Sequence, residues 1–239
     1  MWLINNKVNV EDSGLLEGFR DCHCHLLPGV DDGVQDTNET MRILEEWERC
    51  GVREVWLTPH IMEDIPNEAL ALRNKLEILT AYYRGNIKLH LAAEHMMDGL
   101  FIKLLEKNDV MSIGRGRDKL LVETSYYTPP MNMRNIIEHV KTKGFKPILA
   151  HPERYQYMDK NDYRMWKRLG VLLQLNVPSL VGAYGPDVQQ KAEWLLRENM
   201  YDYCGTDTHS IGQMELFLNS RICTKIAKKV KQISDSQEL

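Results

Sequence analysis

Short apolar runs alternate along this chain with longer segments whose apolar residues recur at helical spacing. Each apolar run has the length of a β-strand, and most end at a histidine or a carboxylate. We expect strands at about 19–25, 54–58, 87–93, 120–122, 146–150, 171–176 and 201–206. We expect helices at about 36–50, 66–84, 99–106, 131–143, 162–169, 186–199 and 215–230. Strands that alternate with helices predict an α/β fold in which helices cover a parallel sheet.

The number of such units bears on the architecture. Seven units in one run favour a barrel of the TIM type over an open sheet. We find no linker, low-complexity segment or internal repeat, so residues 1–239 are expected to form a single domain. Residues 1–18 are interpreted as a polar lead-in, and the residues after the last helix as a polar tail.

Composition excludes several classes of protein. The formal charge of −4 gives no basic footprint for nucleic acid. Five cysteines at scattered positions do not form the framework of a disulfide-rich secreted protein. The N-terminus lacks the apolar core of a signal peptide, and no apolar run is long enough to span a membrane. A soluble protein of the cytoplasm, with no inserted membrane segment, is therefore expected.

The segment around His23 and His25 carries the first chemical signal. Two histidines at i and i+2 of a strand project from one face, beside Asp21 and opposite Cys22 and Cys24. The chain then turns, so that Asp32 can fold back toward them. Imidazoles with a nearby carboxylate bind divalent ions. Taken alone, the same pattern also fits two ordinary polar histidines.

The positions of the other histidines and carboxylates strengthen the metal interpretation. Six of the seven predicted strands end at such residues, and the sixth strand instead offers Gln174 and Asn176. The C-terminal strand ends of α/β folds lie on one rim, where active sites are built. So many donors exceed the needs of one ion and fit two or three, with Glu123 as a candidate bridge. The donors are His23, His25, His60, Glu94, Glu123, His151, Asp207 and His209.

Some residues near these positions are given other roles. Asp31 is interpreted as a turn residue, and strand alternation points His95 away from Glu94. His90 and His139 are expected to be structural or on the surface. Cys22 and Cys24 are expected to face the helices as small apolar side chains.

Arg154 lies three residues after His151. A guanidinium beside a metal cluster is suited to clamp a phosphate. The alternative is an ordinary ion pair with Glu153 or another surface acid. The Cys-x5-Arg loop of cysteine-dependent phosphatases, the nucleotide-binding P-loop, the dinucleotide fingerprint and the Gly-x-Ser-x-Gly elbow are absent.

The ordered motifs resemble a known superfamily. The strings HCHLLPGVDDG from His23, TPH at 58–60, AE at 93–94, LVE at 121–123, AHPERY at 150–155 and DTH at 207–209 are similar to the PHP (polymerase and histidinol phosphatase) superfamily. Within it they resemble the CpsB/YwqE-like protein-tyrosine phosphatases of capsule and exopolysaccharide operons. The likeness runs from about Phe19 to His209.

The resemblance implies a distorted (β/α)7 barrel with two or three divalent ions at its rim. Manganese is the expected metal, with iron, zinc, cobalt or magnesium as alternatives. The implied substrate is the phosphotyrosine tail of a membrane-associated bacterial autokinase that regulates polysaccharide synthesis. The implied metal ligands are His23, His25, Asp32, His60, Glu94, Glu123, His151, Asp207 and His209, and Arg154 would bind the phosphate.

Catalytic roles follow from the same resemblance. Arg154 and the metals would stabilise charge on the phosphoryl oxygens, and Asp207 or His209 would protonate the leaving oxygen unless the metals occupy both. Related enzymes often carry another arginine after the D-x-H motif. Here residues 210–214 contain none, and Arg221 is the next arginine. A small-molecule phosphatase of histidinol-phosphate type, a phosphodiesterase and a regulatory protein with weak turnover remain alternatives.

Overall fold

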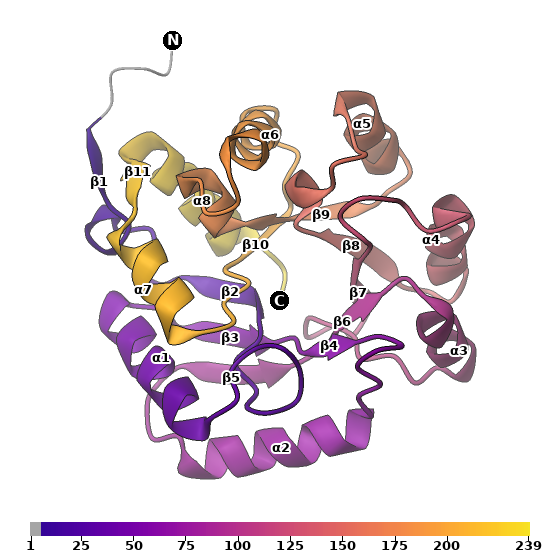
Figure 1. Ribbon diagram of the computed structural model, residues 1–239, viewed down its shortest axis with the longest axis horizontal. Coiled ribbons are helices and arrows are strands. Elements are labelled where there is room, and N and C mark those ends of the chain that lie inside the picture. The colour runs from indigo at the N-terminus through magenta and orange to yellow at the C-terminus, as the bar shows by residue number, and fades with distance from the viewer. Residues whose placement is uncertain (1–5) are drawn as a thin grey trace.

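The structure is a computed structural model that describes residues 6–239 (Figure 1). Its strands are β1 (Lys7–Asn9), β2 (Arg20–Cys24), β3 (Glu54–Leu57), β4 (His60–Ile61), β5 (Lys88–Leu91), β6 (Glu94–Met96), β7 (Lys119–Glu123), β8 (Lys146–Ala150), β9 (Leu172–Asn176), β10 (Tyr203–Gly205) and β11 (Arg221–Cys223). Its α-helices are α1 (Thr37–Cys50), α2 (Ala69–Tyr82), α3 (Gly99–Lys107), α4 (Met133–Thr142), α5 (Lys160–Arg168), α6 (Pro186–Arg197), α7 (Ile211–Asn219) and α8 (Thr224–Ser236).

The main strands form two parallel sheets. One has the order β10-β9-β8-β7-β6-β4, and the other has the order β2-β3-β5. The expected strands at 54–58 and 87–93 correspond to β3 and β5, and each is followed by a short strand that was not expected. The chain leaves the small sheet after β3 and after β5, and it enters the large sheet at β4 and β6. The sequence analysis missed these two breaks, because β4 and β6 follow β3 and β5 after only two residues each.

At the opposite edge the two sheets meet where β10 runs beside β2. The backbone N–H of Asp207 donates to the carbonyl of His23 at 2.7 Å, and the N–H of His25 donates to the carbonyl of Thr208 at 2.9 Å. The helices lie around the outside of the strands (Figure 1). The predicted helix-covered parallel arrangement is confirmed. The hydrogen bonding, however, gives two sheets with a seam and not one continuous barrel.

Local signals explain where the helices begin and end. In α1, the side chain of Asp36 accepts the N–H of Asn38, and Gly51 ends the helix with a left-handed backbone. Ile43, Leu44 and Trp47 share its buried face. The expected helix at 36–50 is therefore confirmed, and burial of this face against the sheet supplies most of its stability.

A second apolar cluster lies between the sheets, apart from the main core under the helices. It includes Cys22, Trp56, Leu121, Ile148 and Leu239. Cys24 belongs to the main core, as expected, but the prediction that Cys22 faces the helices is wrong. The pairing of β2 with β3 shifts register between Asp21 and Cys24, and this irregularity breaks the simple alternation of side chains.

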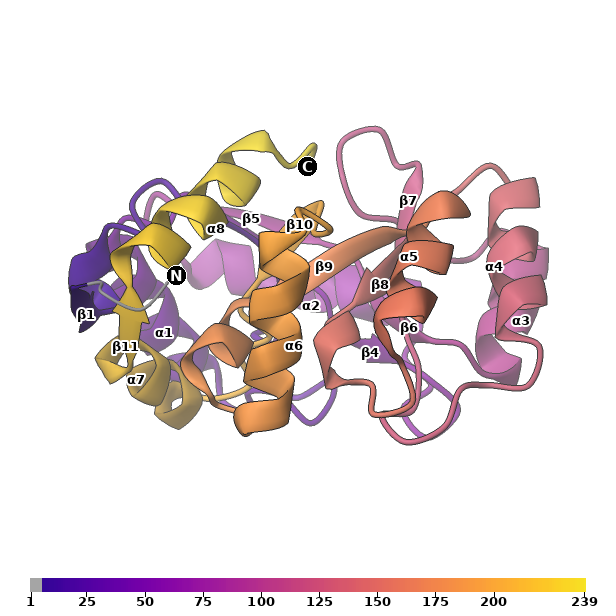
Figure 2. The ribbon, with the colours of Figure 1, turned by 90° about the horizontal axis from the view of Figure 1, so that it is seen from above.

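The C-terminal segment also differs from expectation. The helix predicted at 215–230 is two helices, α7 and α8, separated by β11. The predicted polar tail is partly buried: Gln237 Oε1 accepts the N–H of Cys204 at 3.0 Å, and Leu239 joins the cluster between the sheets. The C-terminus accordingly lies at the centre of the ring of strands in Figure 1, and Figure 2 shows α8 leading toward it along one edge.

The predicted lead-in is also more than a polar extension. Strand β1 pairs antiparallel with β11, and Val10, Leu15 and Leu16 are buried in the main core. The first five residues lie outside the described part of the chain. Among the helices of residues 6–239, none combines the length and the apolar character needed to cross a bilayer.

Candidate metal centre

The nine donors expected from the sequence meet at one edge of the two sheets. His23 and Glu123 lie in strands, at or next to the last residue, and His60 and Glu94 are the first residues of β4 and β6. The other five donors lie in the loops that follow β2, β8 and β10. Eight of the nine form three groups whose donor atoms lie within 4.8 Å of one another. The groups are His25–Asp32–His60–His209, His23–His25–Glu94–Asp207 and His60–Glu94–Glu123.

The three groups adjoin because they share residues. His25 belongs to the first and second groups, His60 to the first and third, and Glu94 to the second and third. Glu94, not Glu123, is thus the carboxylate shared between groups. The ninth residue, His151, lies beside them, with its Nε2 2.9 Å from Glu94 Oε1 and 3.7 Å from Glu123 Oε2.

Three histidines are oriented by hydrogen bonds from Nδ1. His23 Nδ1–H donates to Gln174 Oε1 at 3.0 Å, and His25 Nδ1–H donates to Asp31 Oδ2 at 2.8 Å. His209 Nδ1–H donates to the carbonyl of Asp207 at 2.8 Å. Each bond fixes a ring and leaves Nε2 with a free lone pair, as in protein metal sites. The Nε2 atoms of His23 and His25 lie only 3.1 Å apart.

Unpartnered donor atoms indicate what this cluster can hold. His60 Nδ1 lies 3.2 Å from Glu94 Oε2 and 3.0 Å from Glu123 Oε1, yet these three buried atoms form no hydrogen bond. Buried polar atoms without partners are costly. Lone pairs that converge in this way fit a cation, so the residues present suit divalent ions.

The electrostatics of the cluster also favour bound cations. Burial alone would raise the pKa of Glu94, but the charges of His23 and His60 hold it well below its usual range. Burial opposes the charge of His23, but Glu94 and Asp207 raise its pKa to about 9. The buried carboxylates therefore attract positive charge strongly, and divalent ions can compete with protons for these positions.

Backbone geometry brings two of the donors into place. His151 and Asp207 have left-handed backbones, with φ of 32° and 52°. Such conformations are unfavourable for residues other than glycine and concentrate at functional sites. Gly205 permits close packing nearby, because a Cβ at that position would lie 2.6 Å from the Cβ of His23.

Arg154 lies at the same rim, and its ion pair is with Asp207. Its Nη1 donates to Asp207 Oδ2 at 2.7 Å, and its guanidinium carbon lies 4.3 Å from the ring centroids of both Tyr126 and Tyr184. The alternative pairing with Glu153 is wrong, since that buried side chain accepts from Tyr201 and from the N–H of Asn176. The guanidinium is held between two aromatic rings beside the donor cluster.

A cavity of about 330 Å³ opens over the cluster. Donors from each of the three groups reach its wall, together with Arg154, both tyrosines and Gln213. Gln213 belongs to residues 210–214, where the family resemblance suggested an arginine that this chain lacks. Arg221 does not replace that arginine, because it lies on β11 and donates to the carbonyl of Lys7 at 2.5 Å.

The residues given other roles lie outside the three donor groups. His95 is buried, and its Nε2 accepts the N–H of Met111, so it points away from the centre as expected. His90 and His139 contact Glu54 and Glu106 respectively. Asp31 is a turn residue as predicted, accepting the N–H of Gly33, but it also orients His25.

The sequence analysis missed four supporting residues. Gln174 and Asn176 were noted only as the exception among the strand ends, yet Asn176 Nδ2 donates to Asp207 Oδ2 at 3.0 Å. Their position at a strand end beside the donors was the available signal. Tyr126 and Tyr184 gave no signal in the sequence. Each lies in a loop, and its distance along the chain from Arg154 does not indicate that it would stack on the guanidinium.

Comparison with known proteins identifies relatives over most of the chain. The chain is 26% identical over 197 residues to the tyrosine-protein phosphatase YwqE of Bacillus subtilis (strain 168), covering 80% of this chain and 77% of the relative. It is 25% identical over 231 residues to the tyrosine-protein phosphatase CpsB of Streptococcus pneumoniae, covering 89% and 93%.

A solved structure supports the fold. A chain from the crystal structures of YwqE from Bacillus subtilis and CpsB from Streptococcus pneumoniae, described as unique metal-dependent tyrosine phosphatases, superposes with a TM-score of 0.77. The match covers 91% of this chain and 88% of that chain at 23% identity. The family model for capsular polysaccharide synthesis proteins CpsB/CapC matches residues 19–235. This chain therefore belongs to the CpsB/CapC family.

Proposed function

We propose that this protein is a metal-dependent phosphatase that hydrolyses phosphotyrosine in proteins of capsule or exopolysaccharide synthesis. The observation that carries the proposal is the position of Arg154, whose guanidinium lines the same cavity as the donor cluster. A phosphoryl group in that cavity would lie within reach of the planar guanidinium and of any ions held by the donors. The names of the relatives support the same reaction.

The proposal assigns two or three divalent ions to the nine donors named above. The imidazoles of this set suit iron, zinc and cobalt, and its four carboxylates suit manganese and magnesium. We take manganese as the first candidate. When bound, such ions activate water and neutralise charge on the phosphoryl oxygens. On this proposal the fold is a single domain related to a distorted (β/α)7 barrel, in which β3 with β4 and β5 with β6 each count as one interrupted strand.

The protein's own residues supply binding and orientation. Arg154 binds the phosphoryl oxygens, and the rings of Tyr126 and Tyr184 keep its guanidinium planar and in place. Asp207 and His209 both belong to donor groups, so we assign them to the metals first and to protonation of the leaving oxygen second. A tyrosinate is a good leaving group and needs less assistance from an acid.

We further propose that the substrate is the phosphotyrosine tail of a membrane-associated autokinase and that the protein acts in the cytoplasm. The family's role in capsular polysaccharide synthesis supports such a partner. The five cysteines, none of them paired, are compatible with a reducing compartment. Residues 210–214 include Gln213 and no arginine. This observation favours one alternative, a regulatory protein that binds the tail but turns over slowly.

The test is hydrolysis of p-nitrophenyl phosphate by metal-stripped protein after addition of Mn²⁺, Fe²⁺, Co²⁺, Zn²⁺ or Mg²⁺. We expect metal to restore turnover, and Arg154→Ala to lower kcat/KM by about 10²–10³-fold, the usual effect of losing one donor to a developing charge. Phosphotyrosine peptide, histidinol phosphate and a phosphodiester are then compared. Preference for histidinol phosphate or the diester, or tight peptide binding without turnover, would contradict the proposal.

A further inference from the structure

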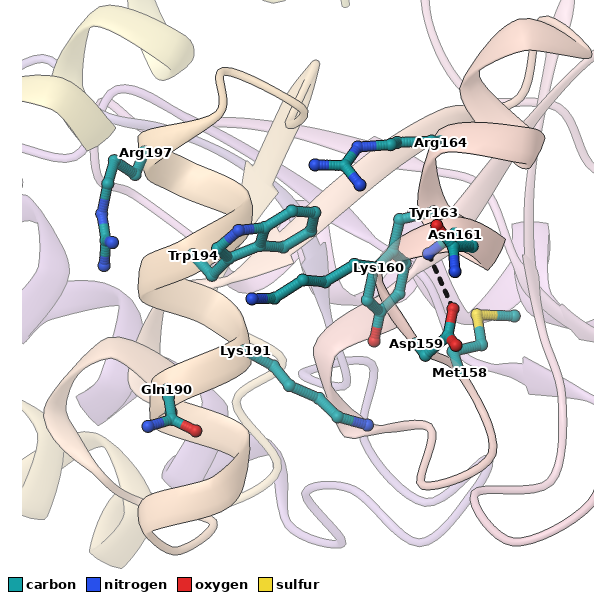
Figure 3. Close-up of a pocket in the computed structure, with 10 residues that line it drawn as sticks. All are labelled: Met158, Asp159, Lys160, Asn161, Tyr163, Arg164, Gln190, Lys191, Trp194 and Arg197. Atoms are coloured by element: carbon teal, nitrogen blue, oxygen red, sulfur yellow. Dashed lines mark hydrogen bonds between the residues drawn. The ribbon is translucent and has the colours of Figure 1, made fainter.

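A second cavity, of about 710 Å³, lies between α5 and α6 (Figure 3). Its wall carries Lys160, Arg164, Lys191 and Arg197 around the indole of Trp194. Figure 3 shows Lys160 and Arg164 extending from α5 toward Trp194 on α6. Figure 3 shows Arg197 directed away from α5, and the Lys191 ammonium donates to the carbonyl of Tyr155 at 2.7 Å. Lys160 and Arg164 are therefore the two cations of this wall that mark the hollow as a site for an anion.

The cations at the entrance are available to a ligand. Lys160 Nζ and the guanidinium carbon of Arg164 lie 5.3 Å and 5.4 Å from the Trp194 ring centroid. Within residues 6–239, neither side chain has a carboxylate at ion-pair distance. The one acid in the wall, Asp159, accepts the N–H groups of Asn161 and Asp162 as the cap of α5.

The basic cavity is separated from the candidate active site by a third cavity, which shares wall residues with both. This third cavity has a volume of about 540 Å³. It shares Arg154 and Tyr184 with the cavity over the donor cluster, and it shares Gln190 and Lys191 with the basic cavity. The three hollows therefore adjoin one another in a series, which we call the track.

The length of this track can be estimated from the helix. Pro186 lines the middle cavity and Trp194 the basic one. At 1.5 Å of rise per residue they are ~12 Å apart along α6. An extended peptide covers that distance in about four residues. A peptide whose phosphotyrosine reaches Arg154 can thus place a residue about four positions away among the cations.

We infer that this track binds the substrate segment on one side of the phosphotyrosine, and that the basic cavity selects an anionic side chain there. The anion is a carboxylate or a second phosphotyrosine, whose ring would pack on Trp194. This inference rests on the proposed function and names the substrate class for the same site: phosphotyrosine flanked at about four residues by negative charge.

The experiment measures binding of peptides that cannot be hydrolysed, built around phosphonomethyl-phenylalanine in place of phosphotyrosine. Three peptides carry Gln, Glu or a second phosphonomethyl-phenylalanine at the flanking positions three to five residues away, on both sides. Wild-type protein is compared with Lys160→Gln/Arg164→Gln. The matched control is Arg168→Gln/Lys225→Gln, which removes two exposed cations outside the track.

We expect the double variant to raise the Kd of the anionic peptides by about fivefold or more at low salt, where ion pairs are screened least. The effect is modest because each exposed ion pair contributes little to binding. Its Kd for the Gln peptide and its turnover of p-nitrophenyl phosphate should match wild type, as should all values for the control. The Glu and phosphonate peptides separate the two sources of charge. Equal Kd values for anionic and Gln peptides, or equal losses in both double variants, would overturn the inference.

Failure of the proposed function has a different signature. In that case wild-type protein would show no turnover of p-nitrophenyl phosphate with any metal, while the peptide-dependent difference in Kd would persist and still support the track. Hydrolysable peptides give the second readout: the double variant should lose kcat/KM on anionic phosphotyrosine peptides only, through KM.

Discussion

Gln174 Oε1 accepts a hydrogen bond from His23 Nδ1 at 3.0 Å, and it also accepts the backbone N–H of His151 at 3.1 Å. Gln174 lies on β9, the strand whose end bears no histidine or carboxylate. One amide oxygen thus orients donors that come from two other strands. Strand β9 carries none of the nine candidate donors, and it contributes to the cluster by holding donors from its neighbours.

We expect Gln174→Leu to weaken metal binding by about 10- to 100-fold, because His23 loses the partner that selects its tautomer. The measurement is recovery of activity as metal is titrated into stripped protein, with calorimetry for affinity. Gln232→Leu, at an exposed position of α8, serves as the control. Unchanged affinity in the Gln174 variant would show that the bond is incidental.

The aromatic stack on Arg154 gives the second prediction. Tyr126→Leu removes one ring at 4.3 Å from the guanidinium and should lower kcat/KM by about tenfold, the size of a partly desolvated cation–π contact. Tyr126→Phe keeps the ring and should retain wild-type kinetics. Equal losses in both variants would mean that the hydroxyl, and not the stack, is required.

Close packing at Gly205 gives the third prediction. In Gly205→Ala the new Cβ would lie 2.6 Å from the Cβ of His23 and 2.7 Å from its backbone nitrogen. Displacement of β2 should lower the free energy of unfolding by about 1–3 kcal/mol and weaken metal binding. Gly212 lies within α7, and a Cβ there would be 4.0 Å from its nearest neighbour, Ser210 Oγ. Gly212→Ala should therefore be neutral or slightly stabilising. Urea unfolding with and without metal checks both; wild-type stability for Gly205→Ala would refute the clash.

His95 gives a pH dependence. Burial lowers the pKa of this imidazole from 6.5 to about 4, so it stays neutral when the unfolded chain takes up a proton. Its contribution to stability is therefore complete above about pH 6.5 and is lost as the pH falls toward 4. At pH 5 the loss is on the order of 2 kcal/mol.

His95→Gln tests this because glutamine keeps an acceptor for the N–H of Met111 but does not titrate. The free energy of unfolding of this variant should fall less than that of wild type between pH 7 and pH 5, measured with urea. His139→Gln, at a half-exposed position, provides the comparison. Parallel pH profiles for wild type and His95→Gln would exclude the buried imidazole as the cause.

Much of the fold was predictable because the signals are local. Helix α1 has its cap at Asp36, its stop at Gly51 and a buried face at helical spacing, all visible in the sequence. The missed features depend on distant contacts. Strand β11 exists because it pairs with β1, which lies more than 200 residues earlier in the chain. Burial of Leu239 depends on the space left between two sheets.

The sequence by itself determined which residues are available to the centre. Histidines and carboxylates follow the predicted strands, and parallel strands place their C-terminal ends on one rim, so the donor set could be named from spacing and order. Arg154 was identifiable for the same reason, by its position after His151.

Only the tertiary structure decided how these residues are used. The partner of each imidazole nitrogen, the sharing of Glu94 between two groups and the stacking of Arg154 between Tyr126 and Tyr184 depend on sheet register and loop paths. The position of the basic cavity depends on how α5 packs beside α6. Local pattern reports which face of an element is buried, whereas contacts between elements are set by packing of the whole chain.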